Sequence, residues 1–271
     1  MKKDEPDYVA SSIDELLGAI DDIEEQTCTT DGQFEHLWYR GQGDFSWRLQ
    51  PSIQRYDADE EIERGLVNDF YVRASHVIDV PAPRNDYATW LSKAQHYGVP
   101  TRLLDWSGSP LVAAFFATEE DITSDACVWV LRPGVINRCG NHSGCLHPLD
   151  SRTAMEMMRS AFADREIPQE YDRGVLACYA VGKDPRVYTQ QSCFTIHHDR
   201  SIQLDNVDSF PEFADVVFRI MIPMQCKLQM KHQLAMVGIT SGFIYPDLEH
   251  IARDLKRSYG LKMQNPTKPT A

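Results

Sequence analysis

The sequence predicts a mixed α/β fold of the α+β kind, with a sheet surrounded by helices. Residues 126–131, ACVWVL, form a continuous apolar run that is typical of a buried strand. Several other segments read as helices and alternate with strand segments along the chain. No internal repeat and no linker rich in glycine and serine divides the 271 residues, of which 42% are hydrophobic, so the chain can bury one substantial core.

The expected elements follow one another along the chain. The first is a helix over Ile13–Glu25, capped by Ser11 or Ser12, whose acidic face is solvated. A short buried strand over His36–Tyr39 then ends at Arg40. The later elements are helices over 60–78 and 87–96, a helix from Pro110, the strand over 126–131, a helix over 151–162, strands over 186–197 and 216–223, a helix over 231–237 and a last helix from Asp247.

These elements divide the chain into three parts. Residues 1–32 are expected to form a helical N-terminal extension, and residues 33–257 the main domain. Residues 258–271 form a tail, whose last eight residues contain two prolines and are expected to be disordered.

Composition narrows the class of protein. The chain has 27 basic and 40 acidic residues and a net charge of −13, which argues against sequence-independent nucleic-acid binding over its whole surface but allows a local basic groove. Its seven cysteines lack even spacing, and it has neither an apolar segment at its start nor a run of eighteen apolar residues. These features predict a cytoplasmic protein with reduced thiols and no membrane contact.

A polar cluster directly precedes the helix expected from Pro110. Proline suits the first turn of a helix, because its missing N–H would have no partner there. The cluster can be a functional site held at a rigid helix entrance, or it can be an N-cap in which Ser107 or Ser109 accepts a hydrogen bond from a free N–H. Its members are Thr101, Arg102, Asp105, Trp106, Ser107 and Ser109.

A second cluster lies at Trp38–Gln42. Arg40 ends a buried strand among aromatic residues, so its guanidinium must meet a carboxylate, a carbonyl or an anionic ligand, and its planar fork suits a phosphate. A structural salt bridge, for example to Asp105, remains an equal alternative. Gly41 allows another group to approach the backbone closely.

Together these segments resemble the FRG domain family, named for a Phe-Arg-Gly triplet in which Tyr39 here replaces the Phe. The resemblance extends over about residues 33–257 and rests on successive motifs. The motifs are Tyr39-Arg40-Gly41-Gln42, Trp47-x-Leu49-x-Pro51-Ser52, Gln95-His96-Tyr97-Gly98-x-Pro100 to Trp106, Ser109-Pro110, Ala113 to Ala117, Gln191-x-x-Phe194 and Tyr245 to Glu249.

The order of the motifs is similar to that of ADP-ribosyltransferases, and this implies a mixed sheet core of that type with NAD as substrate. Arg40 corresponds to the first element and Thr101–Ser109 with Ala113–Ala117 to the second. In the third element Gln191 stands where the family has a glutamate, so Asp105 or Glu249 would have to act as base.

The resemblance implies a set of site residues. Tyr39, Tyr97 and Trp106 would stack on the nicotinamide, although each can equally be a core residue. An ordinary position in the first turn of a helix that Asp247 caps explains Glu249 fully and is favoured over a catalytic role. The implied catalytic residues are Arg40, Asp105, Gln191 and Glu249, and the implied NAD-binding residues are Tyr39, Arg40, Gly41, Gln42, Tyr97, Thr101, Arg102, Trp106 and Ser109.

The function that the resemblance implies is NAD-dependent ADP-ribosylation of a protein or nucleic-acid acceptor by a toxin or antiphage effector. A neutralising antitoxin partner would accompany it, with the acidic N-terminal helix as one docking surface. Two alternatives stay open. The protein can be an NAD glycohydrolase that transfers the ribosyl group to water, or a non-catalytic module that binds a nucleotide or a protein.

Two further groups of soft ligands have simple interpretations. Cys139, His142, Cys145 and His147 could surround zinc, but their spacing fits no common zinc module and a glycine-rich surface loop explains them more simply. Cys193 is interpreted as a buried thiol rather than a nucleophile, because no His–Asp arrangement is visible around it.

Overall fold

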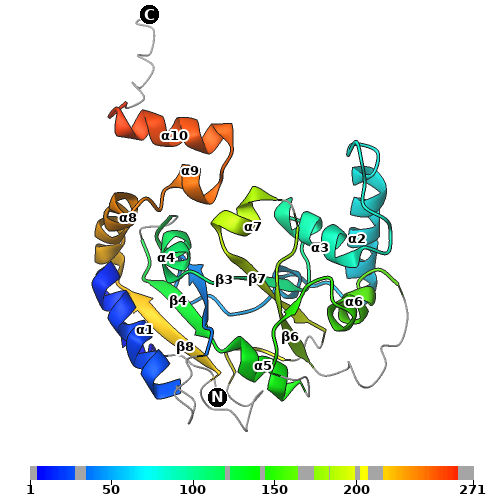
Figure 1. The fold of residues 1–271 in the computed structure, drawn as a ribbon, viewed down its shortest axis with the longest axis horizontal. Coiled ribbons are helices and arrows are strands. Elements are labelled where there is room, and N and C mark those ends of the chain that lie inside the picture. The colour runs from blue at the N-terminus through cyan, green and yellow to red at the C-terminus, as the bar shows by residue number, and fades with distance from the viewer. Residues whose placement is uncertain are drawn as a thin grey trace, which may run out of the picture.

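A computed structural model describes residues 5–27, 35–119, 123–140, 144–163, 174–182, 184–198, 202–206 and 216–261. Its centre is a mixed eight-stranded sheet with the order β1-β8-β4-β2-β3-β7-β6-β5 (Figure 1). The strands are β1 (Tyr8–Val9), β2 (Trp38–Gln42), β3 (Leu103–Ser107), β4 (Ala126–Leu131), β5 (His147–Pro148), β6 (Val175–Tyr179), β7 (Ser192–His197) and β8 (Val217–Ile222). The two outer pairs, β1–β8 and β5–β6, are parallel and the inner pairs are antiparallel, which confirms the mixed fold class.

The helices begin where the sequence offers caps. Ser12 accepts a hydrogen bond from the amide of Glu15, and Asp59, Asp86 and Ser151 each accept one in the same way. The α-helices are α1 (Ile13–Thr27), α2 (Glu60–Ala74), α3 (Tyr87–His96), α4 (Pro110–Glu119), α5 (Pro133–Cys139), α6 (Arg152–Arg159), α7 (Pro185–Thr189), α8 (Lys227–Met236), α9 (Ser241–Ile244) and α10 (Leu248–Ser258). Two 3₁₀ helices, η1 (Ser52–Arg55) and η4 (Met224–Cys226), complete them.

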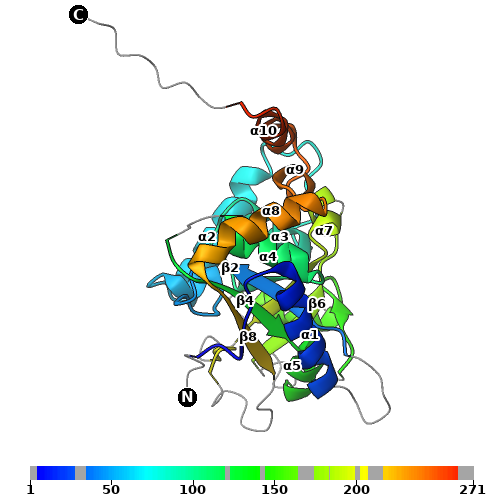
Figure 2. The ribbon, with the colours of Figure 1, turned by 90° about the vertical axis from the view of Figure 1, so that its left-hand side faces the viewer.

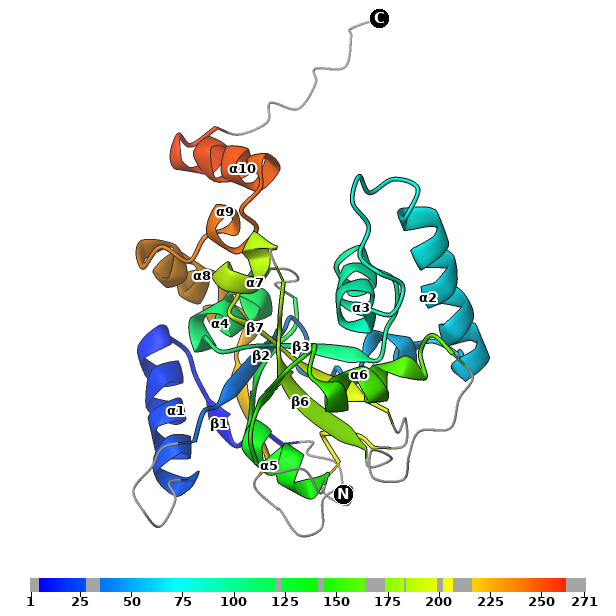
Figure 3. The same ribbon diagram turned by 45° about the vertical axis from the view of Figure 1, so that its right-hand side comes forward.

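Two groups of helices cover different parts of one sheet face. Helices α1, α4 and α8 pack on β2, β4 and β8, and α1 and α8 face the viewer in Figure 2. Helices α2, α3 and α6 pack on β3, β6 and β7, and Figure 3 shows this group on the other side of the sheet centre. The opposite face buries Trp38, Trp106 and Trp129 beside α5. The boundary between the two groups therefore falls where β2 meets β3.

Strands β2 and β3 are joined over a short length only. Their register pairs Tyr39 with Ser107, whereas five successive pairs join β2 to β4 and another five join β3 to β7. Helix α4 lies directly against β2 at Gly41, where a methyl group would come within 2.6 Å of the amide nitrogen of Ala117. The close approach predicted at Gly41 is thus made by a helix backbone.

The structure differs from the expected elements at the start of one strand, and it packs the N-terminal segment against the sheet. The strand expected over 186–197 begins only at Ser192, because Asp184 caps a helix that has Pro185 in its first turn. Gln191 then takes a positive φ of 46° before β7 begins. Within the region expected to be an extension, β1 pairs with β8 and α1 buries Leu16 and Ile23 in the core, while its acidic residues other than Glu24 are exposed. The tail residues expected to be disordered lie outside the described residues.

Candidate functional site

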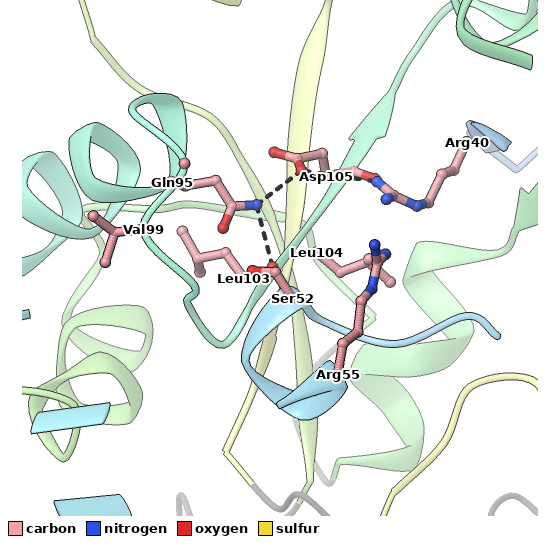
Figure 4. A pocket seen from close by; sticks show the side chains of 9 residues that line it. Arg40, Ser52, Arg55, Gln95, Val99, Leu103, Leu104 and Asp105 are labelled. Atoms are coloured by element: carbon pink, nitrogen blue, oxygen red, sulfur yellow. Dashed lines mark hydrogen bonds and ion pairs between the residues drawn. The ribbon is translucent and has the colours of Figure 1, made fainter. Parts of the chain in front are cut away.

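A cleft of about 210 Å³ opens where β2 and β3 part (Figure 4). It is enclosed by β2, by η1, by the segment that follows α3 and by β3. Its lining residues are Arg40, Ser52, Arg55, Gln95, Gly98, Val99, Leu103, Leu104 and Asp105. The charged residues among them are two arginines and one aspartate.

Arg40 reaches the cleft from β2 and forms a long ion pair with Asp105, the salt bridge that the sequence offered as an alternative. Its Nη1 donates a hydrogen bond of 2.8 Å to the main-chain carbonyl of Asp105, while the carboxylate Oδ2 of Asp105 lies 3.8 Å from Nη1. Only 18% of the Arg40 side chain is exposed, and its buried Nε has no hydrogen-bond partner among the described residues. Burial lowers the pKa of this guanidinium, the Asp105 carboxylate offsets part of that effect, and the positive charge of Arg55 lowers the pKa further. An arginine nevertheless stays protonated, so the cleft contains an incompletely compensated cation.

Arg55 is a second cation on the cleft, and it lies outside the motifs identified in the sequence. It ends η1, and Figure 4 shows its guanidinium pointing toward that of Arg40. Its hydrogen bond goes to the carbonyl of Gln50 at 3.5 Å, and no carboxylate pairs with it within the described ranges. The available signal was the turn that starts at Pro51-Ser52, because one turn of 3₁₀ helix places the third residue after Ser52 beside it.

A chain of hydrogen bonds fixes the single carboxylate of the cleft. Thr101 donates its hydroxyl hydrogen to Oε1 of Gln95, and Nε2 of Gln95 donates to Asp105 Oδ2 at 2.8 Å and to the carbonyl of Leu103 at 3.2 Å. The Asp105 side chain is 56% exposed, so its carboxylate remains accessible to solvent or to a ligand. The predicted proximity of Arg40 and Asp105 is confirmed.

The balance of charges favours an anionic ligand. Two guanidinium groups face one carboxylate that already accepts a hydrogen bond from Gln95. Arg40 is largely buried and Arg55 is exposed, so their repulsion is only partly screened by solvent. A phosphate or carboxylate bound between the arginines would remove this repulsion and supply the missing acceptors.

Comparison with known families agrees with this region of the chain. The family model described as the FRG domain matches residues 35–126, about a third of the chain. The protein contains an FRG domain. The match includes every residue that lines the cleft, whereas the resemblance noted around Gln191 and Tyr245–Glu249 lies beyond it. No curated protein and no solved structure matches the chain.

Three residues expected to bind NAD are instead buried in the interior of the protein. Arg102 points away from the cleft and forms a buried ion pair with Glu63 of α2, with Nη2–Oε2 and Nε–Oε1 distances of 2.7 and 2.9 Å. Tyr39 and Trp106 are 5% and 3% exposed and belong to two core clusters. The two rings lie on opposite faces of the sheet, because Tyr39 packs with residues of α1, α4 and α8, whereas Trp106 packs with Trp38 and Trp129 beside α5. Both rings therefore occupy core positions, which is the alternative to nicotinamide stacking that the sequence left open.

The other expected NAD-binding residues take positions around the cleft of the FRG domain rather than in it. Ser109 caps α4 by accepting a hydrogen bond of 3.4 Å from the amide of Val112, which confirms the capping alternative. Gln42 is buried and accepts a hydrogen bond of 2.7 Å from Nε1 of Trp129. Tyr97 is exposed and directly precedes Gly98 of the cleft, while Thr101 acts through Gln95.

Two of the four expected catalytic residues are not among the cleft-lining residues. Gln191 precedes β7 at the far end of β3, where its carbonyl accepts a hydrogen bond of 2.9 Å from the amide of Gly108. Glu249 lies in the first turn of α10, with its side chain 80% exposed and paired with Arg253 at 3.3 Å. Its position is that of an ordinary first-turn residue.

The described residues give no support to a metal or cysteine site. No group of three or more histidine, cysteine, aspartate or glutamate side chains in these ranges could hold a metal ion, and His142 of the predicted cluster lies outside them. Burial raises the pKa of Cys193 to about 12, so this thiol stays protonated near neutral pH. None of the helices in the described part of the chain is long and apolar enough to cross a membrane.

Proposed function

We propose that the cleft binds a phosphate of NAD and that the protein is an NAD-dependent ADP-ribosyltransferase. The observation that carries the proposal is the incompletely compensated Arg40, which ends in a cleft, has one carbonyl acceptor and keeps a carboxylate only at 3.8 Å. Arginine binds phosphate through paired N–H donors, which an ordinary carbonyl acceptor does not satisfy.

Asp105 is the group suited to the chemical step. Transfer of ADP-ribose breaks the bond between nicotinamide and ribose through an oxocarbenium-like state, which a nearby carboxylate stabilises. The same carboxylate can accept a proton from the incoming acceptor. Gln95 holds Asp105 Oδ2 at 2.8 Å and so fixes the carboxylate beside the arginines.

The size of the cleft limits how the ligand can lie. Ligand pockets usually measure about 300–1,000 Å³, whereas this cleft measures about 210 Å³. It therefore suits the diphosphate and an adjoining sugar better than a whole dinucleotide. The remainder of NAD would extend across the mouth, past the exposed carboxylate of Asp105.

A second candidate is an NAD-binding domain that hydrolyses NAD or only binds it. It is favoured by the positions of Gln191 and Glu249, which leave Asp105 as the only acidic residue among those that line the cleft. A lone exposed carboxylate can activate water as well as a macromolecular acceptor. The proposed role as a toxin or antiphage effector with an antitoxin partner rests on the FRG resemblance.

The test is incubation of the purified protein with labelled NAD, with and without cell extract. Transfer of label to protein or nucleic acid supports the transferase, release of free ADP-ribose supports the glycohydrolase, and unchanged NAD supports a binding module. Arg40→Ala should abolish either turnover. Arg73→Ala is the matched control, because this arginine is 83% exposed on α2 and does not line the cleft.

A further inference from the structure

Arg55 is an exposed arginine at the end of η1 that makes few contacts with the rest of the protein. Its one hydrogen bond, to the carbonyl of Gln50, is long at 3.5 Å, and among the described residues it forms no ion pair. It nevertheless points toward Arg40 from the opposite wall of the cleft (Figure 4), where the two like charges oppose each other. Arg55 is exposed, so solvent screens part of this repulsion, and an anionic ligand between the two guanidinium groups would compensate both charges.

Two separated guanidinium groups fit two linked phosphates better than one. Each planar fork can donate two parallel hydrogen bonds to the oxygens of one phosphate. Arg40 comes from β2 and Arg55 from η1, and each approaches the space between them from its own wall. A single phosphate can pair fully with one fork, whereas a diphosphate presents a set of oxygens to both.

We propose that Arg40 and Arg55 form a two-part clamp for the diphosphate group, in which Arg55 provides the preference for two linked phosphates over one. The inference rests on the proposed function, because it specifies how the same cleft holds NAD. It adds a residue that neither the motifs nor the resemblance contains. Ser52 also lines the cleft, but its hydroxyl already accepts a hydrogen bond of 3.1 Å from the amide of Thr101.

The test compares two ligands of nearly equal charge by titration calorimetry on the full chain. ADP-ribose carries about two negative charges over two phosphates, and AMP carries about −1.5 to −2 on one phosphate at neutral pH. A preference of the protein for ADP-ribose would therefore report the number of phosphates rather than the net charge.

Arg55→Ala should weaken ADP-ribose binding by about ten- to a hundredfold, which is the effect of losing a hydrogen bond to a charged group. AMP binding should change by less than about threefold. Arg40→Ala should weaken both ligands, and Arg73→Ala neither. Because Arg55 makes so few contacts, the Arg55→Ala protein should keep the wild-type melting temperature, and Arg55→Lys should recover part of the lost affinity.

The outcomes separate this inference from the proposed function. Equal losses for ADP-ribose and AMP in Arg55→Ala, or unchanged ADP-ribose binding, would overturn the clamp even if the protein consumes NAD. Binding of ADP-ribose that depends on Arg55 in a protein that leaves NAD intact would support the clamp and reject the transferase. Absence of ADP-ribose binding to the wild-type protein would overturn the clamp.

Discussion

Arg40 is hydrogen-bonded to the main chain of Asp105, with an Nη1–O distance of 2.8 Å, and forms a longer ion pair with the Asp105 carboxylate, with an Nη1–Oδ2 distance of 3.8 Å. The bond ties β2 to β3 at the point where their pairing has ended. It also leaves both the guanidinium and the carboxylate with capacity for a ligand.

Arg40→Ala should leave stability nearly unchanged. Losing a hydrogen bond from a charged donor costs about 1.5–3 kcal/mol, but a buried, poorly compensated cation is itself unfavourable, so the two effects offset each other. We expect a change of less than about 1 kcal/mol in the free energy of unfolding, measured by urea denaturation. A loss of several kcal/mol would show that Arg40 is a structural residue.

Asp105→Asn should separate binding from turnover. The amide oxygen can still accept the hydrogen bond from Gln95, so the cleft keeps its shape, but the negative charge beside the arginines is gone. NAD affinity should stay equal or rise, while the rate of turnover falls by about 10²–10⁴-fold, as expected for loss of a general base. Calorimetry and single-turnover kinetics measure the two effects. Turnover near the wild-type rate would remove Asp105 from the mechanism.

Arg102→Ala should destabilise the protein strongly. The change leaves the Glu63 carboxylate, which is 1% exposed, without its partner, and breaking such a buried pair costs about 3–5 kcal/mol. The double variant Arg102→Met/Glu63→Leu should recover much of this loss, because it removes both charges. Arg64→Ala is the control, since its pair with Glu60 is exposed and worth about 0.5 kcal/mol or less. Urea denaturation of all three variants provides the comparison.

His197 should make the protein less stable in acid. Burial lowers its pKa from 6.5 to about 3, so the folded state holds the ring neutral while the unfolded chain protonates it near pH 6.5. Protonation of His197 therefore does not affect the free energy of unfolding above pH 6.5. Below pH 6.5 it lowers the free energy of unfolding by about 1.4 kcal/mol per pH unit until the pH approaches 3.

His197→Gln isolates this effect from the other titrating groups. The amide can accept a hydrogen bond from the hydroxyl of Thr195, which lies 3.0 Å from the ring Nε2 of His197. The unfolding free energy of the wild type minus that of the variant should fall by about 1.4 kcal/mol per pH unit between pH 6.5 and pH 4. A constant difference would show that the ring is not buried in its neutral form.

Local signals in the sequence predicted most elements and the centre of the site. Caps at Ser12 and Asp247 marked helix starts, and the run of apolar residues marked β4. The buried arginine at a strand end required an acceptor, and the structure places Asp105 there. These predictions needed information from only a few neighbouring residues.

The predictions that failed depended on distant partners. Nothing near Arg102 indicates that its carboxylate partner, Glu63, comes from a helix 39 residues earlier. Arg55 becomes part of the site only because η1 packs beside Thr101, with the amide of Ile53 donating a hydrogen bond to the Thr101 carbonyl at 3.2 Å. Such long-range packing leaves no periodic pattern in the sequence.

The position of β1 has a consequence for the order of folding. Asp7, just before β1, accepts a hydrogen bond of 2.6 Å from the amide of Arg219, 212 positions along the chain, and β1 pairs only with β8. Closing such a long loop costs more entropy than joining the strands and turns of residues 38–131 that build the cleft. In pulsed hydrogen exchange during refolding, the amides of β2, β3 and β4 should therefore gain protection before those of β1, so the ligand cleft would exist before the sheet is complete.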